Sequence, residues 1–117
     1  MNISSIGGRV GGTPGLGAYQ TAKFAVEGFS EVLANEVAGF GVKVIIVEPG
    51  AFRTDWMGSS MTMHDPGPDY REALGVMHEL RRNANGSQSG DPARAARIII
   101  DVVETPAPPR RLLLGSD

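Results

Sequence analysis

The feature that most constrains the fold is a short apolar run, VKVIIV, at residues 42–47. It is rich in β-branched residues and nearly free of polar ones, which is typical of a strand in a parallel sheet that is covered on both faces. Pro49 and Gly50 are expected to end it, because proline has no amide hydrogen for the ladder. A strand of this kind needs a helical layer on each side, so the sequence predicts an α/β fold.

Helices are predicted on both sides of this strand. Residues 18–38 carry apolar side chains at spacings of three and four, and glycines follow, as at many helix ends. The apolar stripe predicted for that helix consists of Ala22, Val26, Phe29, Leu33 and Val37. Asp91 followed by Pro92 is typical of a helix start. The inward face predicted for this second helix consists of Ala93, Ala96, Ile100 and Val103.

A last short strand is predicted at residues 111–114, after a proline-containing break. The chain then reads as loop, helix, strand, long loop, helix and strand. Strands separated by helices in this way are expected to run parallel in one sheet. A chain of 117 residues has room for one domain at most.

Composition limits the partners that are expected. Eleven lysines and arginines against thirteen acidic residues give a net charge of −2, so no basic face for a nucleic acid or an anionic membrane is predicted. Cysteine is absent and the two histidines stand apart, so no disulfide or metal site is expected. No stretch has the length or features of a membrane span or a signal peptide, and a cytoplasmic location is expected.

The sharpest chemical motif is the pair Tyr19 and Lys23, which share one face of the predicted helix. A phenol titrates near pKa ~10. A neighbouring ammonium favours the phenolate, so the pair can pass a proton to or from a substrate oxygen. The alternative is a solvated helix face with an exposed lysine, because a short motif alone is weak evidence.

Two flanking segments give this pair a context. The sequence NISS at residues 2–5 ends about where a strand would end, and PGAFRT at residues 49–54 directly follows the next strand. In this order, the three motifs resemble the second half of a short-chain dehydrogenase/reductase. The resemblance extends over essentially the whole chain and is strongest from residue 2 to residue 54. It implies a partial Rossmann-like parallel sheet, formed by the last strands and helices of a doubly wound NAD(P)-binding fold.

The resemblance also implies catalytic roles. Tyr19 would be the general acid/base. Lys23 would favour its phenolate and hydrogen-bond the nicotinamide ribose. Ser5 would hold and polarise the substrate carbonyl oxygen, with Ser4 as the alternative register. The implied reaction is hydride transfer between the nicotinamide and a small-molecule alcohol or ketone.

The cofactor implied by the resemblance is NAD or NADP, and the sequence leaves open which of the two. The segment after the central strand would line the nicotinamide by backbone contacts, and Thr54 would bond its carboxamide. The expected cofactor-binding residues are Tyr19, Lys23, Pro49, Gly50, Ala51, Phe52 and Thr54.

Residues 55–90 have the weakest periodic signal and resemble the family's substrate-binding lid, with a short helix expected between Tyr70 and Arg82. This segment contains four large side chains that an apolar substrate would contact, or that would pack in an ordinary way: Trp56, Met57, Met61 and Met63.

The glycines of residues 6–17 offer a competing interpretation. Gly11, Gly15 and Gly17 have the spacing of the family's cofactor-phosphate loop, and Glu48 would then be a ribose-binding acid. No apolar strand precedes these glycines, however, and Val10 stands where the family has threonine. We expect instead a tight passage from strand to helix beside the active site.

The family's phosphate loop, its Asn-Asn-Ala-Gly motif and its catalytic asparagine have no counterpart in this sequence. Residues 1–117 are therefore expected to be the C-terminal catalytic half of a single domain. The alternatives are a non-catalytic or truncated fragment, or one half of a two-chain assembly. Sugar-nucleotide epimerases and dehydratases share the Tyr-x-x-x-Lys pair, but the short lid disfavours them. The resemblance further implies a homo-oligomer through the helix at residues 18–38.

Overall fold

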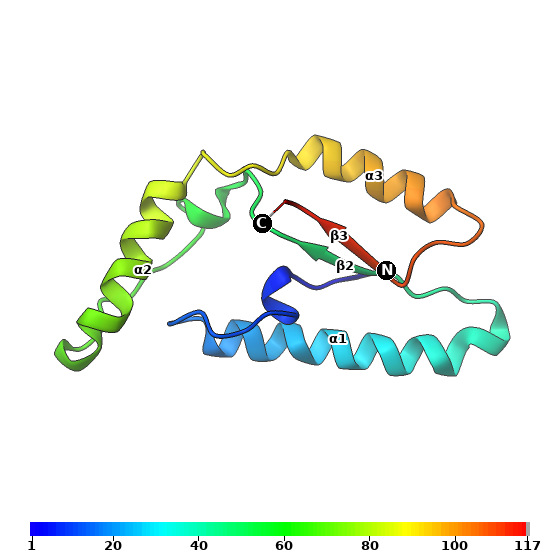
Figure 1. The fold of residues 1–117 in the computed structure, drawn as a ribbon, viewed down its shortest axis with the longest axis horizontal. Helices are drawn as coiled ribbons and strands as arrows, with labels where there is room; N and C mark the ends of the chain where they lie inside the picture. Colours follow the sequence, from blue (N-terminus) through cyan, green and yellow to red (C-terminus); the bar gives the residue numbers. More distant parts are fainter. Residues whose placement is uncertain (117) are drawn as a thin grey trace.

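Three parallel strands form one sheet in the computed structural model, which describes residues 1–116. The strands lie in the order β1 (Asn2–Ile3), β2 (Ile46–Pro49) and β3 (Arg111–Leu114). Helix α1 (Gly17–Val37) lies on one side of the sheet and α3 (Pro92–Glu104) on the other (Figure 1). Helix α2 (Arg71–Ala84) stands away from the sheet, toward the end at which β3 finishes (Figure 1). The predicted α/β fold with parallel strands is confirmed.

Four single-turn helical segments complete the described chain, at Ile6–Gly8, Ala38–Phe40, Asp55–Met57 and Pro68–Tyr70. The last of these leads directly into α2, so the long segment between β2 and α3 is largely helical in its second half. No helix within residues 1–116 is both long enough and apolar enough to cross a membrane.

The central strand differs in its bounds from the expectation. The sequence predicted residues 42–47, whereas β2 begins at Ile46 and includes Pro49. Successive residues of a parallel strand bond alternately to its two neighbours. The nitrogen of Pro49 therefore faces the side of β1, which ends opposite Val47, while Gly50 N donates to Leu114 O at 2.7 Å on the other side. The proline occupies a position where no donor is needed.

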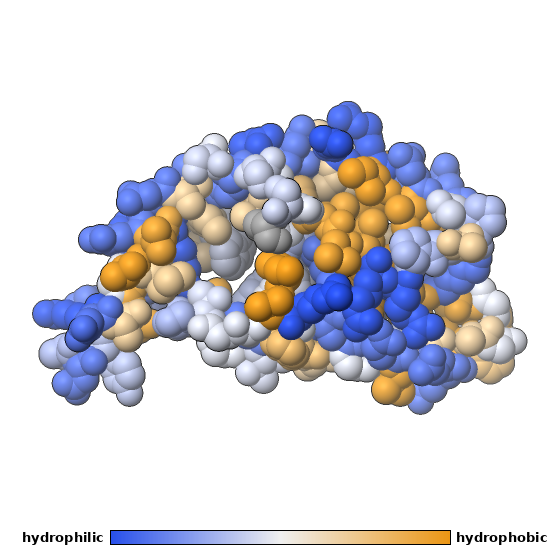
Figure 2. Space-filling view, in the orientation of Figure 1, coloured by the Kyte–Doolittle hydropathy of each residue, from blue (hydrophilic) through white to orange (hydrophobic). Residues whose placement is uncertain are grey.

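The two faces of β2 meet different chemistry, although residues 45–48 are all buried. Ile45 and Val47 form the core with Leu114, against the apolar side of α3. Ile46 and Glu48 alternate with them and face the opposite layer, toward α1. Figure 2 shows hydrophobic side chains gathered over α3 and the adjoining sheet, and hydrophilic ones between the sheet and α1.

The prediction of which side of α3 faces the core is wrong: most of the residues that pack inward stand one position before the predicted ones. The side chains of α3 that pack on the core are Ala95, Ile98, Ile99 and Val102, and the four predicted residues are exposed. Both sets have helical spacing because apolar residues nearly encircle this helix. The predicted helix start is confirmed, since Asp91 Oδ1 accepts from Ala93 N at 2.9 Å.

Helix α1 also departs from its predicted apolar stripe. Ala22 and Phe29 are exposed, whereas Val26, Leu33 and Val37 are half-buried. Most of its buried side chains are polar; the buried residues are Gln20, Glu27, Ser30 and Ala34. Polar residues are buried on this side because the facing sheet surface is itself polar.

A network of charges accounts for that polar layer. Arg9 Nη1 donates to Glu48 Oε2 at 3.1 Å, and Arg111 Nε lies 3.0 Å from Glu48 Oε1. Arg111 Nη2 also donates to Glu27 Oε2 at 3.2 Å. Burial opposes the charged form of Arg111, but Glu31, Glu27 and Glu48 outweigh it and raise the pKa of the guanidinium. Glu48 is thus engaged inside the protein by two arginines.

Candidate active site

Ser5 is positioned by the end of β1. The chain leaves the sheet after Ile3 and enters the turn Ile6–Gly8, and Ser5 is the N-cap of that turn. Gly7 N donates to Ser5 Oγ at 3.1 Å, which leaves the hydroxyl hydrogen of this buried serine able to donate elsewhere. Ser4 is buried beside it, and a Cβ added at Gly8 would lie 2.6 Å from Ser4 Oγ.

Tyr19 and Lys23 lie in the first two turns of α1. The ammonium of Lys23 is 5.9 Å from the centre of the Tyr19 ring, and it donates to Ile3 O at 3.0 Å. This bond ties α1 to the end of β1. Because an ammonium has three donors, Lys23 retains capacity for a ligand. Trp56 also lies beside Tyr19, with 5.8 Å between the centres of the two rings.

Residues 50–54 follow β2, and Gly90 holds this segment by backbone hydrogen bonds. Gly90 N donates to Ala51 O, and Arg53 N donates to Gly90 O, both at 3.0 Å. Thr54 then caps the turn Asp55–Met57, with its Oγ1 accepting from Trp56 N at 3.4 Å. The segment therefore has a backbone path fixed by hydrogen bonds on both sides of Phe52.

These segments line one cavity of about 510 Å³ at the carboxyl ends of β1 and β2. Open α/β sheets bind ligands at this edge. Every residue predicted for catalysis or cofactor binding lines it: Ser5, Tyr19, Lys23, Pro49, Gly50, Ala51, Phe52 and Thr54. The alternative serine, Ser4, also lines the cavity. Segments up to about fifty positions apart in sequence thus share one site.

Gln20 is a site residue that sequence reasoning missed. Gly12 N donates to its Oε1 at 3.2 Å, and its Nε2 donates to Thr13 Oγ1 at 3.3 Å and to Val10 O at 3.4 Å. Gln20 therefore holds the glycine-rich passage against α1. Its only sequence signal is its place directly after Tyr19, and a glutamine there is equally common on an exposed helix surface.

The glycine-rich passage forms one wall of the cavity through Thr13 and Leu16. Gly12 and Gly15 have φ values of 97° and 79°, in the left-handed region that favours glycine. These turns bring the passage back to α1, beside Tyr19. The glycines therefore allow the passage to form one wall of the cavity. The sequence predicted such a passage beside the active site.

Part of the segment predicted as a lid reaches the cavity. Trp56 and Met57 line it, whereas Met61 and Met63 are not among its lining residues. Farther along, Arg81 Nη2 on α2 donates to Pro14 O at 3.2 Å, which fastens this helix to the glycine-rich passage. The hydrogen bonds from the Ser59 hydroxyl and amide lower the pKa of the Asp55 carboxyl.

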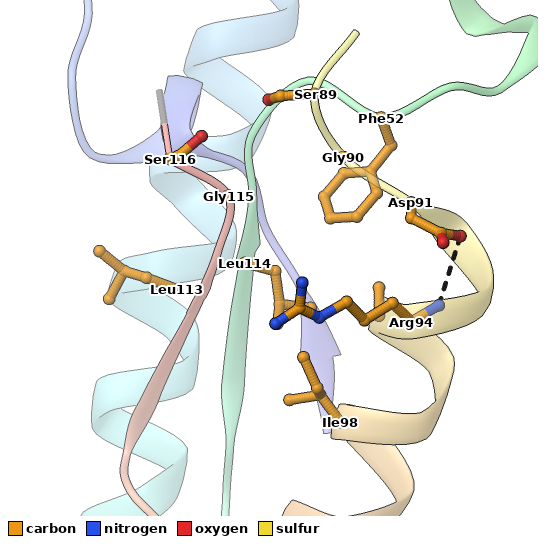
Figure 3. A pocket seen from close by; sticks show the side chains of 11 residues that line it. Phe52, Ser89, Gly90, Asp91, Arg94, Ile98, Leu113, Leu114, Gly115 and Ser116 are labelled. Carbon is orange, nitrogen blue, oxygen red and sulfur yellow. Dashed lines mark hydrogen bonds between the residues drawn. The ribbon is translucent and has the colours of Figure 1, made fainter.

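A second cavity, of about 390 Å³, lies between the start of α3 and the end of β3. Figure 3 shows the Phe52 ring against Gly90 and the Arg94 side chain extending across toward Leu114. Phe52 lines both cavities. Among residues 1–116, no three histidine or acidic side chains gather closely enough in either cavity to hold a metal ion.

Comparisons with known proteins place the chain in a family. A sequence model described as short chain dehydrogenase matches residues 1–65. The chain is 49% identical over 117 residues to Oxidoreductase BOA17 of Botryotinia fuckeliana, covering 100% of this chain and 42% of that protein. It is 37% identical over 116 residues to 3-ketodihydrosphingosine reductase of Bacteroides thetaiotaomicron, covering 98% of this chain and 43% of that protein.

The fold is similar to the crystal structure of a short-chain dehydrogenase from Streptomyces avermitilis. The TM-score is 0.81 at 46% identity, covering 99% of this chain and 42% of that one. The chain therefore spans about two fifths of the length of these proteins. Since the family model matches more than half of its residues, the chain belongs to the short-chain dehydrogenase family.

Proposed function

We propose that residues 1–117 are the C-terminal catalytic half of an NAD(P)-dependent oxidoreductase that interconverts an alcohol and a ketone. The observation that carries the proposal is the single cavity shared by Ser5, Tyr19, Lys23 and the segment 49–54. Within residues 55–90, proposed as the substrate-binding lid, Trp56 and Met57 are the residues that reach this cavity. The oxidoreductases among the relatives support the reaction class.

The cavity offers groups that fit a nicotinamide nucleotide. Lys23 has donors left for a ribose hydroxyl after its bond to Ile3 O. The Thr54 hydroxyl accepts from Trp56 N and can still donate to a carboxamide oxygen. The backbone from Pro49 to Ala51 gives the flat ring a wall that carries no charge. NAD and NADP share these nicotinamide-half contacts.

The proposed step is a reduction in which electrons and protons balance. Lys23, Thr54 and the backbone from Pro49 to Ala51 would hold a nicotinamide nucleotide, whose reduced form would supply a hydride, with its two electrons, for the carbonyl carbon. The Tyr19 hydroxyl gives its proton to the carbonyl oxygen, so that the C=O π bond is replaced by one C–H and one O–H bond. Lys23 stabilises the phenolate that remains, and the Ser5 hydroxyl donates to the carbonyl oxygen. Alcohol oxidation follows the reverse path.

The test compares the two tyrosines of the chain. Tyr19→Phe removes the proposed acid, and the control Tyr70→Phe removes the hydroxyl of an exposed residue outside the cavity. We expect Tyr19→Phe to lower ketone-dependent oxidation of NADH or NADPH about 10²–10⁴-fold, as for loss of a general acid. Tyr70→Phe should leave the rate unchanged. Full activity of Tyr19→Phe would contradict the assignment.

A second candidate is a non-catalytic half that works beside a complementary chain. It is favoured by a surface of 7545 Å², where a monomeric domain of this mass exposes about 6,100 Å². The radius of gyration, 16.5 Å, likewise exceeds the roughly 13 Å of a compact domain of this length. Binding of NADH or NADPH through its nicotinamide half separates the two candidates, because only the catalytic half is expected to show it.

A further inference from the structure

The cavity at Tyr19 is poor in charge. Among the described residues that line it, Lys23 alone carries a charge, and its ammonium already donates to Ile3 O. Much of the remaining lining is apolar, and its large side chains include Ile6, Leu16, Phe52, Trp56 and Met57. Trp56 stands directly beside the Tyr19 ring, at 5.8 Å between ring centres.

The charged residues nearest to this lining are directed to other partners. Arg53, between two lining residues, donates through Nη1 to Gln88 O at 2.8 Å and to Ser89 O at 3.1 Å. The Asp55 carboxylate, between two others, accepts from Ser59 N at 3.1 Å and from Ser59 Oγ at 2.9 Å. Neither side chain lines the cavity. A charged substrate would therefore find no partner in the side chains around Trp56.

The apolar walls are also held in place. Leu16 belongs to the glycine-rich passage, which Gln20 fastens to α1 and Arg81 fastens to α2. Trp56 belongs to the turn that Thr54 caps. Because both residues belong to segments held by hydrogen bonds, binding of an apolar ligand between these walls costs less ordering of the protein.

We propose that the substrate is an uncharged carbonyl compound or alcohol with an apolar body, and that Trp56 and Leu16 determine this specificity. The proposal rests on the proposed function, since it takes Tyr19 as the end of the pocket that receives the carbonyl. An apolar body is favoured because it is removed from water against apolar walls. A carboxylate or phosphate in the same place loses its hydration without a compensating partner.

Trp56 is the single tryptophan of the chain and lines this cavity, so in the folded protein tryptophan fluorescence comes from a residue of the pocket. Two ketones of matched shape serve as probes: cyclohexanone carrying an isopropyl group opposite the carbonyl, and the same ring carrying a carboxylate there. We expect the isopropyl ketone to shift Trp56 emission saturably and to bind at least tenfold more tightly than the carboxylate. Equal or tighter binding of the carboxylate, or no binding of either, would overturn the proposal.

A change of one wall residue tests where the discrimination arises. Leu16→Lys places an ammonium in the pocket and should reverse the preference, so that the carboxylate binds more tightly than the isopropyl ketone. The control Ile100→Lys adds the same charge at an exposed position of α3 outside the cavity and should preserve the wild-type ratio. An unchanged ratio in a folded Leu16→Lys protein would contradict the role of this wall.

Failure of this inference and failure of the proposed function give different results. If the chain discriminates the two ketones by fluorescence but transfers no hydride to either, the specificity stands and the oxidoreductase proposal fails. If it reduces both ketones with the same kcat/KM, the oxidoreductase proposal stands and the specificity fails. Tyr19→Phe should retain the binding preference, because its ring still forms the wall beside Trp56.

Discussion

At the scale of single residues, the packing around Phe52 shows how tightly the cofactor segment is fixed. A Cβ added at Gly90 would lie 2.6 Å from Phe52 Cδ1 and 2.7 Å from Ala51 O. The second of these is a backbone atom and cannot rotate away. Gly90 is therefore needed for the close approach that holds residues 51–53.

Gly90→Ala should destabilise the protein by about 1–3 kcal/mol, because the added methyl forces the backbone and Phe52 to shift. The measurement is urea unfolding followed by Trp56 fluorescence. Gly39→Ala is the matched control, since a Cβ there meets nothing within 4 Å, and it should leave the midpoint nearly unchanged. Equal midpoints for the two variants would show that the approach at Gly90 is looser than the structure has it.

At the scale of elements, α3 offers a direct comparison between two neighbouring isoleucines. Ile99 packs on the core formed by Ile45, Val47 and Leu114, whereas Ile100 is 57% exposed. We expect Ile99→Ala to cost about 2 kcal/mol, by loss of buried methyl groups. Ile100→Ala should change stability by less than about 0.5 kcal/mol, as an exposed substitution does.

Thermal unfolding of the two variants measures this difference. A larger loss of stability for Ile100→Ala than for Ile99→Ala would contradict the orientation of α3 in the structure. It would instead support the inward face that the sequence predicted, which consists of Ala93, Ala96, Ile100 and Val103.

Local signals explain which elements could be predicted from sequence. The apolar run before Pro49, the cap at Asp91 and the strand at residues 111–114 each depend on neighbouring residues, and all appear in the fold. The orientation of the helices could not be predicted in the same way. The buried polar face of α1 depends on Glu48 and Arg111, which other elements bring to it from far along the chain.

The same distinction applies to the site. Tyr19 and Lys23 were recognisable because helical spacing brings them together, and Ser5 because its motif stands in order before them. The wall formed by Thr13 and Leu16 depends on the path of the glycine-rich passage, with its left-handed turns at Gly12 and Gly15. No periodic pattern in the sequence encodes that path. The roles of Gln20, Thr13 and Leu16 could therefore be recognised only from the structure.

At the scale of the whole molecule, the chain exposes about 1,400 Å² more than a monomeric domain of its mass would. This excess is larger than the roughly 800 Å² that each partner buries in a standard protein interface. Three large apolar side chains of α1 are exposed: Phe24, Phe29 and Val32. We propose that the chain covers part of this surface by self-association through α1.

Phe29→Glu should then convert the oligomer to a smaller species, because it places a charge in the apolar contact. Sedimentation velocity at several protein concentrations measures the change. Phe40→Glu is the control: Phe40 is 83% exposed but lies beyond the end of α1, so this variant should sediment as the wild type does. A monomeric wild-type chain, or equal effects of the two variants, would contradict self-association through α1.

On the proposed function, this chain holds the nicotinamide half of a dinucleotide at Tyr19, Lys23 and residues 49–54. Saturation-transfer difference NMR of NADH and of NADPH with the 117-residue chain tests it directly. We predict strong saturation of the nicotinamide and adjoining ribose protons and weak saturation of the adenine protons, for at least one of the two cofactors. Lys23→Met should reduce the ribose signal, and Lys43→Met, outside the cavity, should not. Absence of nicotinamide saturation with both cofactors, or stronger saturation of adenine, would contradict the account and favour the non-catalytic half.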